Sequence, residues 1–134
     1  MSGLEGTTLD HYKLKRRLGH GGMADVYLAR DNSKDRDVAI KVLSGSQAIY
    51  LERFRREAEA IDKLQHKHIL PVYDYGDQEP WHYLVMPYMS AGTLGDLLEE
   101  GPLPLQRAAN IFDQVASALQ FAHDHGIIHR DIKP

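Results

Sequence analysis

The chain has 134 residues, of which 43% are hydrophobic and 26% are charged, a composition that predicts a packed core and excludes a disordered chain. Its formal net charge of -3 provides no basic excess for nucleic acid or an anionic membrane surface. There is no cysteine and no apolar run of about 18 residues, so we expect a soluble, cytoplasmic protein without disulfides, a signal peptide or a membrane span.

The first part of the chain carries strand patterns. Residues 1–10 are rich in small and polar residues and predict a short flexible leader. From Tyr12 to Leu18 apolar and basic residues alternate with a period of two, as in a half-exposed strand. After a glycine cluster, residues 26–29 and 38–43 are apolar enough for strands, and the polar segment 31–37 separates them. We predict three consecutive antiparallel strands.

Residues 49–64 change to a helical period. Placed at 100° intervals, one arc collects the apolar side chains Leu51, Phe54, Ala58, Ile61 and Leu64. Glu57 falls inside this arc, whereas the basic run RFRRE at 53–57 is otherwise interpreted as a solvated helix face. Residues 69–73 and 81–86 are then predicted as two further strands, joined by a turn that contains Asp74, Gly76, Asp77 and Pro80.

The last part of the chain is predicted to be helical. Residues 87–92 form a short connector of small residues, which we interpret as the boundary between a mainly β lobe and a helical lobe. Thr93 to Asp96 fit a capping box. A long helix is expected within residues 104–125, with Gly126 at its C-terminal cap. The chain then ends in HRDIKP, residues 129–134.

The glycine cluster LGHGGMADVYLA has two interpretations. A hairpin turn that simply requires positive φ is the favoured one when the cluster is considered alone. A dinucleotide-binding fold needs a helix after the glycines, and a Walker A loop needs Gly-Lys-Ser/Thr; neither pattern is present. A strand on each side instead favours a hairpin whose backbone N–H groups face the phosphates of a nucleotide.

Lys41 and Glu57 are charged residues in apolar patterns. Lys41 follows a buried strand segment, where an ammonium group needs an anionic partner. Each side chain could extend to solvent along its aliphatic stem. Taken together, the two residues predict an ion pair between strand and helix that directs Lys41 toward phosphate oxygens.

Four motifs occur in a fixed order: LGHGGMADVYLA, VAIK at 38–41, RFRREAEAI around Glu57, and HRDIKP. With these motifs the chain resembles the protein kinase family, in particular the bacterial serine/threonine protein kinases, from Tyr12 to Pro134. The resemblance implies an α+β protein-kinase-like fold. Its expected parts are a five-stranded antiparallel N-lobe with one regulatory helix (11–86), a hinge (87–92) and the first helices of a truncated helical C-lobe (93–134).

The resemblance also implies an ATP site. Lys41, held by Glu57, would contact the α- and β-phosphates, Met86 would be the gatekeeper, and Thr93 would approach the ribose. The backbone of Pro87, which retains its carbonyl, and that of Met89 would meet the adenine edge. The glycine loop and the residues around adenine complete the set: Leu18, Gly19, His20, Gly21, Gly22, Met23, Ala24, Val26 and Ala39.

In the family pattern Asp131 would orient the substrate hydroxyl and Lys133 would steady the transferred phosphate of a protein serine or threonine. His129 is expected to be structural. Magnesium is expected in the family, but its ligands, an Asn five residues after Asp131 and a DFG Asp, are not among these 134 residues, and we predict no metal site. We therefore expect residues 1–134 to be inactive alone, either as a fragment of an active kinase or, alternatively, as a truncated module that binds nucleotide or protein.

Overall fold

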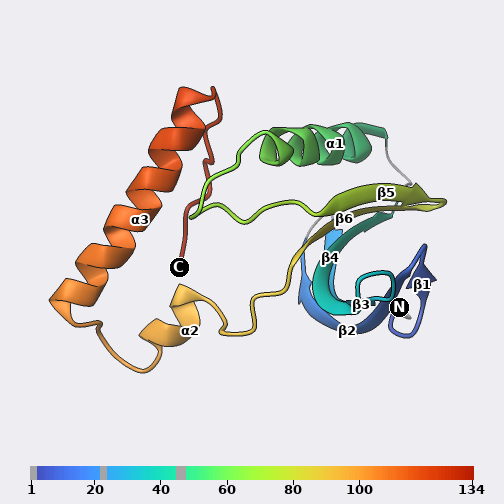
Figure 1. The fold of residues 1–134 in the computed structure, drawn as a ribbon, viewed down its shortest axis with the longest axis horizontal. Helices are drawn as coiled ribbons and strands as arrows, with labels where there is room; N and C mark the ends of the chain where they lie inside the picture. The colour runs from blue at the N-terminus through green and yellow to red at the C-terminus, as the bar shows by residue number, and fades with distance from the viewer. Residues whose placement is uncertain (1–2, 22–23, 45–47) are drawn as a thin grey trace. The chain divides into compact units, whose positions relative to one another are not determined.

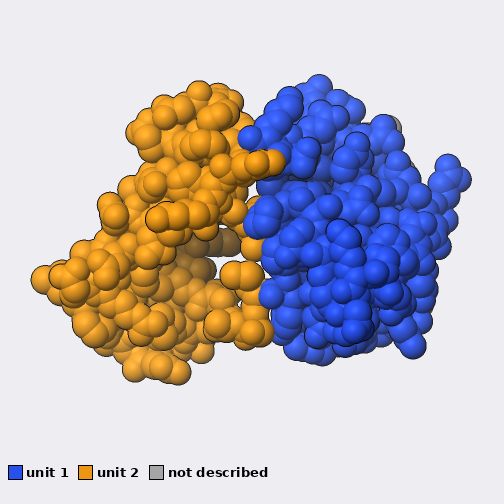
Figure 2. Space-filling view, in the orientation of Figure 1, with its two compact units in different colours: residues 1–63, 71–88 blue, residues 64–70, 89–134 orange. Residues whose placement is uncertain are grey.

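The computed structural model of the protein describes residues 3–21, 24–44 and 48–134. Two compact units contain these residues: unit 1 comprises residues 1–63 and 71–88, and unit 2 comprises residues 64–70 and 89–134 (Figure 2). Unit 1 contains a β-sheet and one helix, whereas the helices α2 and α3 belong to unit 2.

Unit 1 is built on a six-stranded antiparallel sheet with the strand order β1-β2-β3-β4-β6-β5 (Figure 1). The strands are β1 (Thr8–Leu9), β2 (Tyr12–His20), β3 (Ala24–Asp31), β4 (Arg36–Ser44), β5 (Asp74–Gln78) and β6 (Trp81–Pro87). The antiparallel arrangement predicted from the sequence is confirmed, with one strand more than the five predicted.

The two faces of the sheet bury different clusters. One face carries the larger core, whose fully buried side chains come from five strands: Leu9, Leu14, Tyr27, Ile40 and Val85. The other face carries Leu43 and Leu84, and these pack against Phe54 and Ala58 of α1 (Ala48–Asp62). Because side chains alternate between faces along a regular strand and directly paired residues share a face, this division assigns the paired residues of the sheet to the α1 side or the opposite side.

Two strands differ from the sequence prediction. The sequence places residues 8 and 9 in a flexible leader, whereas the structure pairs them with β2 and buries Leu9 completely. The strand predicted at 69–73 is wrong, and the strand lies one segment later, at β5, in residues predicted as a turn. β5 is an edge strand, and pairing with β6 holds it in the sheet. Because its side chains are mainly exposed, its sequence shows no apolar alternation.

Unit 2 contains the helices α2 (Leu94–Leu98) and α3 (Leu105–Asp124). The capping box is confirmed: the Asp96 N–H donates to Thr93 Oγ1 at 3.1 Å, and the Thr93 N–H donates to Asp96 Oδ2 at 2.8 Å. The bond from the Thr93 N–H to the carboxylate, aided by the Thr93 side chain, holds the pKa of the Asp96 carboxyl below its usual range. Gly126 follows α3 with a φ of 78°, the left-handed cap predicted there.

The loop 64–70 belongs to the same unit as α3 and contacts it through His66. The imidazole Nε2 of His66 lies 3.2 Å from Ser117 Oγ, and its ring centroid lies 5.1 Å from that of Phe121. No helix in the part of the chain that the structure describes is both long and apolar enough to cross a membrane.

Candidate functional site

A row of residues crosses three strands on the α1 side of the sheet. Gly19 of β2 is paired with Val26 of β3, and Val26 is paired with Lys41 of β4. Directly paired residues of antiparallel strands lie on the same face, so the three positions face the same side as α1. The glycine hairpin and Lys41 are therefore brought together by strand register, although they are about 20 residues apart in sequence.

Lys41 and Glu57 form the ion pair that the sequence predicts. Lys41 Nζ donates to Glu57 Oε1 at 2.8 Å. The lysine side chain is 26% exposed and that of Glu57 is 42% exposed. The alternative, in which each side chain extends separately to solvent, is excluded by this contact. The pair leaves the Lys41 ammonium group two further donors for an anion.

The glycine hairpin connects β2 to β3. The Gly21 N–H donates to the Ala24 carbonyl at 2.9 Å, and His20, opposite Asp25 in the ladder, contacts the Asp25 carboxylate through Nδ1. The register of β2 shifts between Arg17 and Gly19, at the position of Leu18. Gly22 and Met23, also predicted as site residues, lie outside the described residues.

Gly19 and Gly21 do not have positive φ, so the interpretation of these two glycines as a turn that requires positive φ is wrong. A Cβ added at Gly19 would meet nothing within 4 Å, which leaves its backbone accessible from the face that carries Lys41. Open space at a glycine allows a ligand to approach the backbone closely.

The predicted adenine-side residues of unit 1 occupy β3, β4 and the end of β6. Ala39 is paired with Met86, and Val38 is paired with Pro87, the last residue of β6. Ala39 and Met86 face the same side as Val26 and Lys41, because they lie two residues from Lys41 and Leu84 along their strands. This face thus presents apolar groups beside the lysine ammonium group.

The remaining predicted residues belong to unit 2. Met89 is exposed, and Thr93 accepts the capping bond of α2 through the hydroxyl group that is predicted to approach a ribose. Gly95 in α2 adjoins the end of the chain, since a Cβ there would lie 3.5 Å from the Pro134 carbonyl oxygen.

The segment HRDIKP holds Asp131 and Lys133 side by side. Lys133 Nζ lies 3.3 Å from Asp131 Oδ2, and both side chains are 74% exposed. His129 Nδ1 accepts the Asp131 N–H at 3.0 Å, which agrees with the structural role expected for His129. Arg130 adopts a φ of 68°, a left-handed conformation uncommon for a residue with a side chain, so this turn is held in a specific form.

The sequence does not predict the contacts that Asp77 makes. Asp77 of β5 lies beside both Arg55 of α1 and His82 of β6. Arg55 belongs to a basic run interpreted as a solvated helix face, and Asp77 falls in a segment predicted as a turn. No sequence pattern links the two residues, because their approach depends on the pairing of β5 with β6.

The sequence comparisons with known proteins all point to the same family. The protein kinase domain family model matches residues 12–134. The serine/threonine-protein kinase PrkC of Bacillus subtilis (strain 168) is 44% identical over 127 residues, covering 92% of this chain and 20% of PrkC. The serine/threonine-protein kinase PknB of Mycobacterium leprae (strain TN) is 47% identical over 134 residues, covering 93% of this chain and 21% of PknB. The chain thus spans about a fifth of the length of these curated relatives.

The comparison with solved structures points to the same family. A single-residue mutant of the Mycobacterium tuberculosis PknI kinase domain superposes on the whole of this chain with a TM-score of 0.81 and 32% sequence identity, and the match covers 57% of that structure. The residues that the family model matches contain the four motifs, with Lys41 and Glu57 among them. The chain belongs to the protein kinase domain family.

Proposed function

We propose that the protein is a serine/threonine protein kinase that transfers the γ-phosphoryl group of ATP to a protein hydroxyl. The observation that carries the proposal is the Lys41–Glu57 contact of 2.8 Å on the face that also carries the glycine hairpin. In phosphoryl transfer most of the rate enhancement comes from positioning and charge stabilisation, and a fixed ammonium group supplies both at the phosphates.

The unit 1 residues support an ATP site with a polar and an apolar part. Lys41 provides donors for phosphate oxygens, Gly19 leaves open space on the same face, and Val26 and Ala39 provide apolar surface for a purine ring. Gly21, whose N–H is bonded to the Ala24 carbonyl, belongs to the proposed set through its place in the glycine loop. The glycine-loop neighbours Leu18, His20, Gly22, Met23 and Ala24, together with Met86 and Pro87, complete the proposed set. Met89 and Thr93 belong to unit 2, and their proposed contacts with adenine and ribose rest on their positions in the family's sequence pattern.

We assign the chemical step to Asp131 and Lys133. An exposed carboxylate with a lysine ammonium group 3.3 Å away is suited to accept a hydroxyl proton while the lysine neutralises charge on the transferred phosphoryl group. The family uses magnesium with ATP. Among residues 3–21, 24–44 and 48–134, no three His, Cys, Asp or Glu side chains gather in a group that could hold a metal ion.

The proposal assigns parts of the chain to the parts of a kinase domain. Residues 11–86, together with β1, would form the N-lobe, 87–92 the hinge and 93–134 the start of the C-lobe. Its partners would be ATP and proteins phosphorylated on serine or threonine. Because ATP is its proposed substrate, we place the domain in the cytoplasm.

The test is phosphoryl transfer by the full-length protein, with MgATP and a set of serine and threonine peptides. Replacing Asp131 by Asn should lower turnover about 100-fold or more, because general-base contributions are of this size. Asp124→Asn is the matched control: Asp124 ends α3 and only accepts a bond from Gln120 at 2.8 Å, so turnover should be unchanged. Equal turnover of the Asp131→Asn variant and the unmodified protein would refute the proposal.

A further inference from the structure

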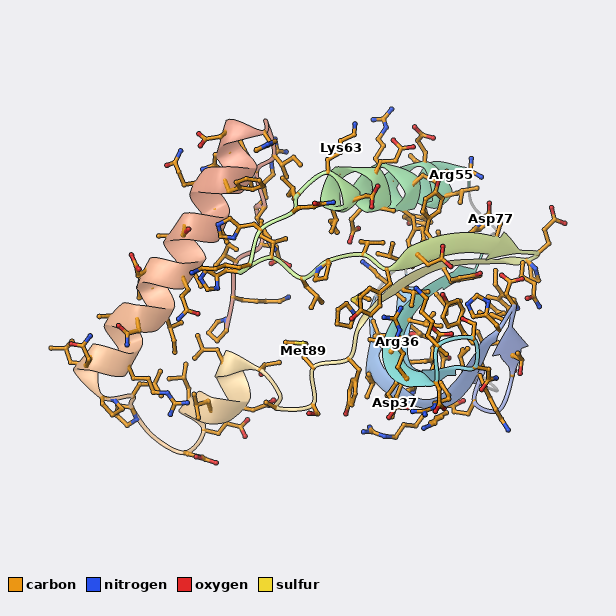
Figure 3. The ribbon with its side chains drawn as sticks, in the orientation of Figure 1. Arg36, Asp37, Arg55, Lys63, Asp77 and Met89 are labelled. Atoms are coloured by element: carbon orange, nitrogen blue, oxygen red, sulfur yellow. The ribbon has the colours of Figure 1, made fainter. Side chains whose placement is uncertain are left out.

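Asp77 holds α1 to the edge of the sheet, on the side of the helix away from Lys41. Its Oδ2 lies 3.6 Å from Arg55 Nη2, and its Oδ1 contacts His82 Nδ1. The two carboxylate oxygens thus serve two different partners. Figure 3 shows Arg55 on the helix with Asp77 on the strand near it.

The strand register places this contact on the α1 side of the sheet. Leu43, which packs against α1, is paired with His82, and His82 is paired with Asp77. Lys41 is in β4 and Asp77 is in β5, with β6 between them. Adjacent strands are about 4.8 Å apart. Lys41 and Asp77, the two sheet residues that pair with charges of α1, are therefore about 10 Å apart in the direction perpendicular to the strands.

The helix presents the matching charges on its two flanks. At 100° per residue, Arg55 and Glu57 are 160° apart measured across the packed side. The buried side chains of Phe54 and Ala58 fall between them, 100° and 60° from Arg55. A roll of α1 in either direction would therefore lengthen one of the two ion pairs.

We propose that Arg55 and Asp77 are positioning residues for the Lys41–Glu57 pair: they fix the roll of α1, so that Glu57 stays within reach of Lys41. This inference rests on the proposed kinase function, in which Lys41 must be held for ATP. His82 supports the contact, since its side chain is only 13% exposed and its ring holds Asp77 toward the helix.

A second tether matters because each ion pair is weak by itself. Arg55 and Asp77 are about half exposed, and Lys41 and Glu57 are partly exposed, so neither pair is strong in water. The packing of Phe54 and Ala58 holds α1 onto the sheet but is not directional, whereas two ion pairs on opposite flanks define an orientation.

The test compares Arg55→Gln, Asp77→Asn and the double variant in the full-length protein, with Arg56→Gln as the matched control. Arg56 is the next residue of α1 and pairs with Glu52 of the same helix at 2.9 Å, with both side chains well exposed. We expect the single changes to lower kcat/KM for ATP by about two- to five-fold, the range for a partly exposed ion pair. The KM for the peptide substrate should not change.

The energetic coupling between the Arg55 and Asp77 substitutions distinguishes a positioning role from a general loss of stability. The double variant should be no worse than the poorer single variant, because both changes remove the same contact, and Arg55→Lys should restore most of the activity. Amide hydrogen exchange within residues 48–62 should be faster in Arg55→Gln than in Arg56→Gln. Additive losses, or an Arg55→Gln variant indistinguishable from Arg56→Gln in both measurements, would overturn the inference.

The Lys41→Ala variant distinguishes a failure of this inference from a failure of the proposed function. If Lys41→Ala abolishes transfer while Arg55→Gln behaves as the control does, the second tether is refuted and the kinase function stands. If Lys41→Ala leaves transfer and ATP affinity unchanged, the proposed function fails, and the role of Arg55 and Asp77 fails with it.

Discussion

The ion pair between Lys41 and Glu57 joins two charged residues from different elements, β4 and α1. Lys41 and Glu57 each interrupt an apolar pattern, and the structure joins them at 2.8 Å. The charges of Arg55 and Asp77 interrupt no such pattern, and their contact depends on the register of an edge strand. A charge inside an apolar sequence pattern indicates a partner, because a buried charge would require one, whereas a charge in a polar segment indicates none.

Asp31, at the end of β3, is a buried carboxylate with several donors. It is 1% exposed and accepts bonds from Ser33 Oγ (2.7 Å), from the Ser33 and Lys34 N–H groups (3.0 and 3.2 Å) and from Arg36 Nε (3.4 Å). Burial raises the pKa of the carboxyl, but the bonds from Ser33, Lys34 and Arg36 outweigh it and hold the pKa below its usual range.

The sign of the pH dependence follows from this lowered pKa. The stabilisation by Asp31 is complete above the pKa of an unfolded Asp, about 3.9, and is lost as the pH falls through the lower folded-state pKa. We expect Asp31→Asn to lower the free energy of unfolding at pH 7 by about 1–3 kcal/mol, as for a buried group that loses its donors. Below about pH 3 the difference should shrink.

Urea unfolding at pH 7 and at pH 3 measures both values. Asp35→Asn is the control in the same turn: Asp35 is 93% exposed, and its φ of 50° is tolerated by Asn. It should change stability by less than about 0.5 kcal/mol. A difference between Asp31→Asn and the unmodified protein that grows as the pH falls would contradict this account.

At the scale of elements, helices and buried strands are predicted well and edge strands are not. The spacing of apolar residues predicts α3 and α1 within two residues at each end, and the apolar runs predict β3, β4 and β6. β1 and β5 lie at the two edges of the sheet and are held by one neighbour each. β1 has only two residues, too few to show alternation although Leu9 is buried, and β5 is mainly exposed, so its pairing with β6 determines it.

Gly76 of β5 lies where a side chain would not fit. It is paired with Tyr83 of β6, and a Cβ at Gly76 would lie 2.5 Å from the Tyr83 hydroxyl oxygen and 2.6 Å from Cζ. Tyr83 is buried, and its hydroxyl donates to Asp10, so the ring has little freedom to move. Gly76 therefore has a packing role that its place in a turn-like segment of the sequence does not indicate.

Gly76→Ala should destabilise the protein by about 1–3 kcal/mol, the usual cost of inserting a group into a packed site. The measurement is urea unfolding of the full-length protein. Gly19→Ala is the control for stability, since a Cβ there meets nothing within 4 Å and its φ is not positive. If the two variants unfold at the same urea concentration, the packing role of Gly76 is wrong.

At the scale of the whole molecule, motif order predicts the family and the residues but leaves their spatial relations open. The sequence places the glycine cluster, Lys41 and Glu57 in three separate elements, and strand pairing then brings them to one face of unit 1. Long-range register depends on the packing of the complete sheet, so no local pattern contains it.

The central claim is that Lys41 binds the phosphates of ATP, and lysine-directed labelling tests it most directly. An acyl-phosphate derivative of ATP transfers its acyl group to a lysine Nζ that lies at the phosphates, and mass spectrometry locates the modified residue. We predict that Lys41 is acylated in preference to Lys13, Lys15 and Lys34, and that excess ATP suppresses the reaction. If Lys41 is not labelled, or is labelled equally with and without ATP, the account is contradicted.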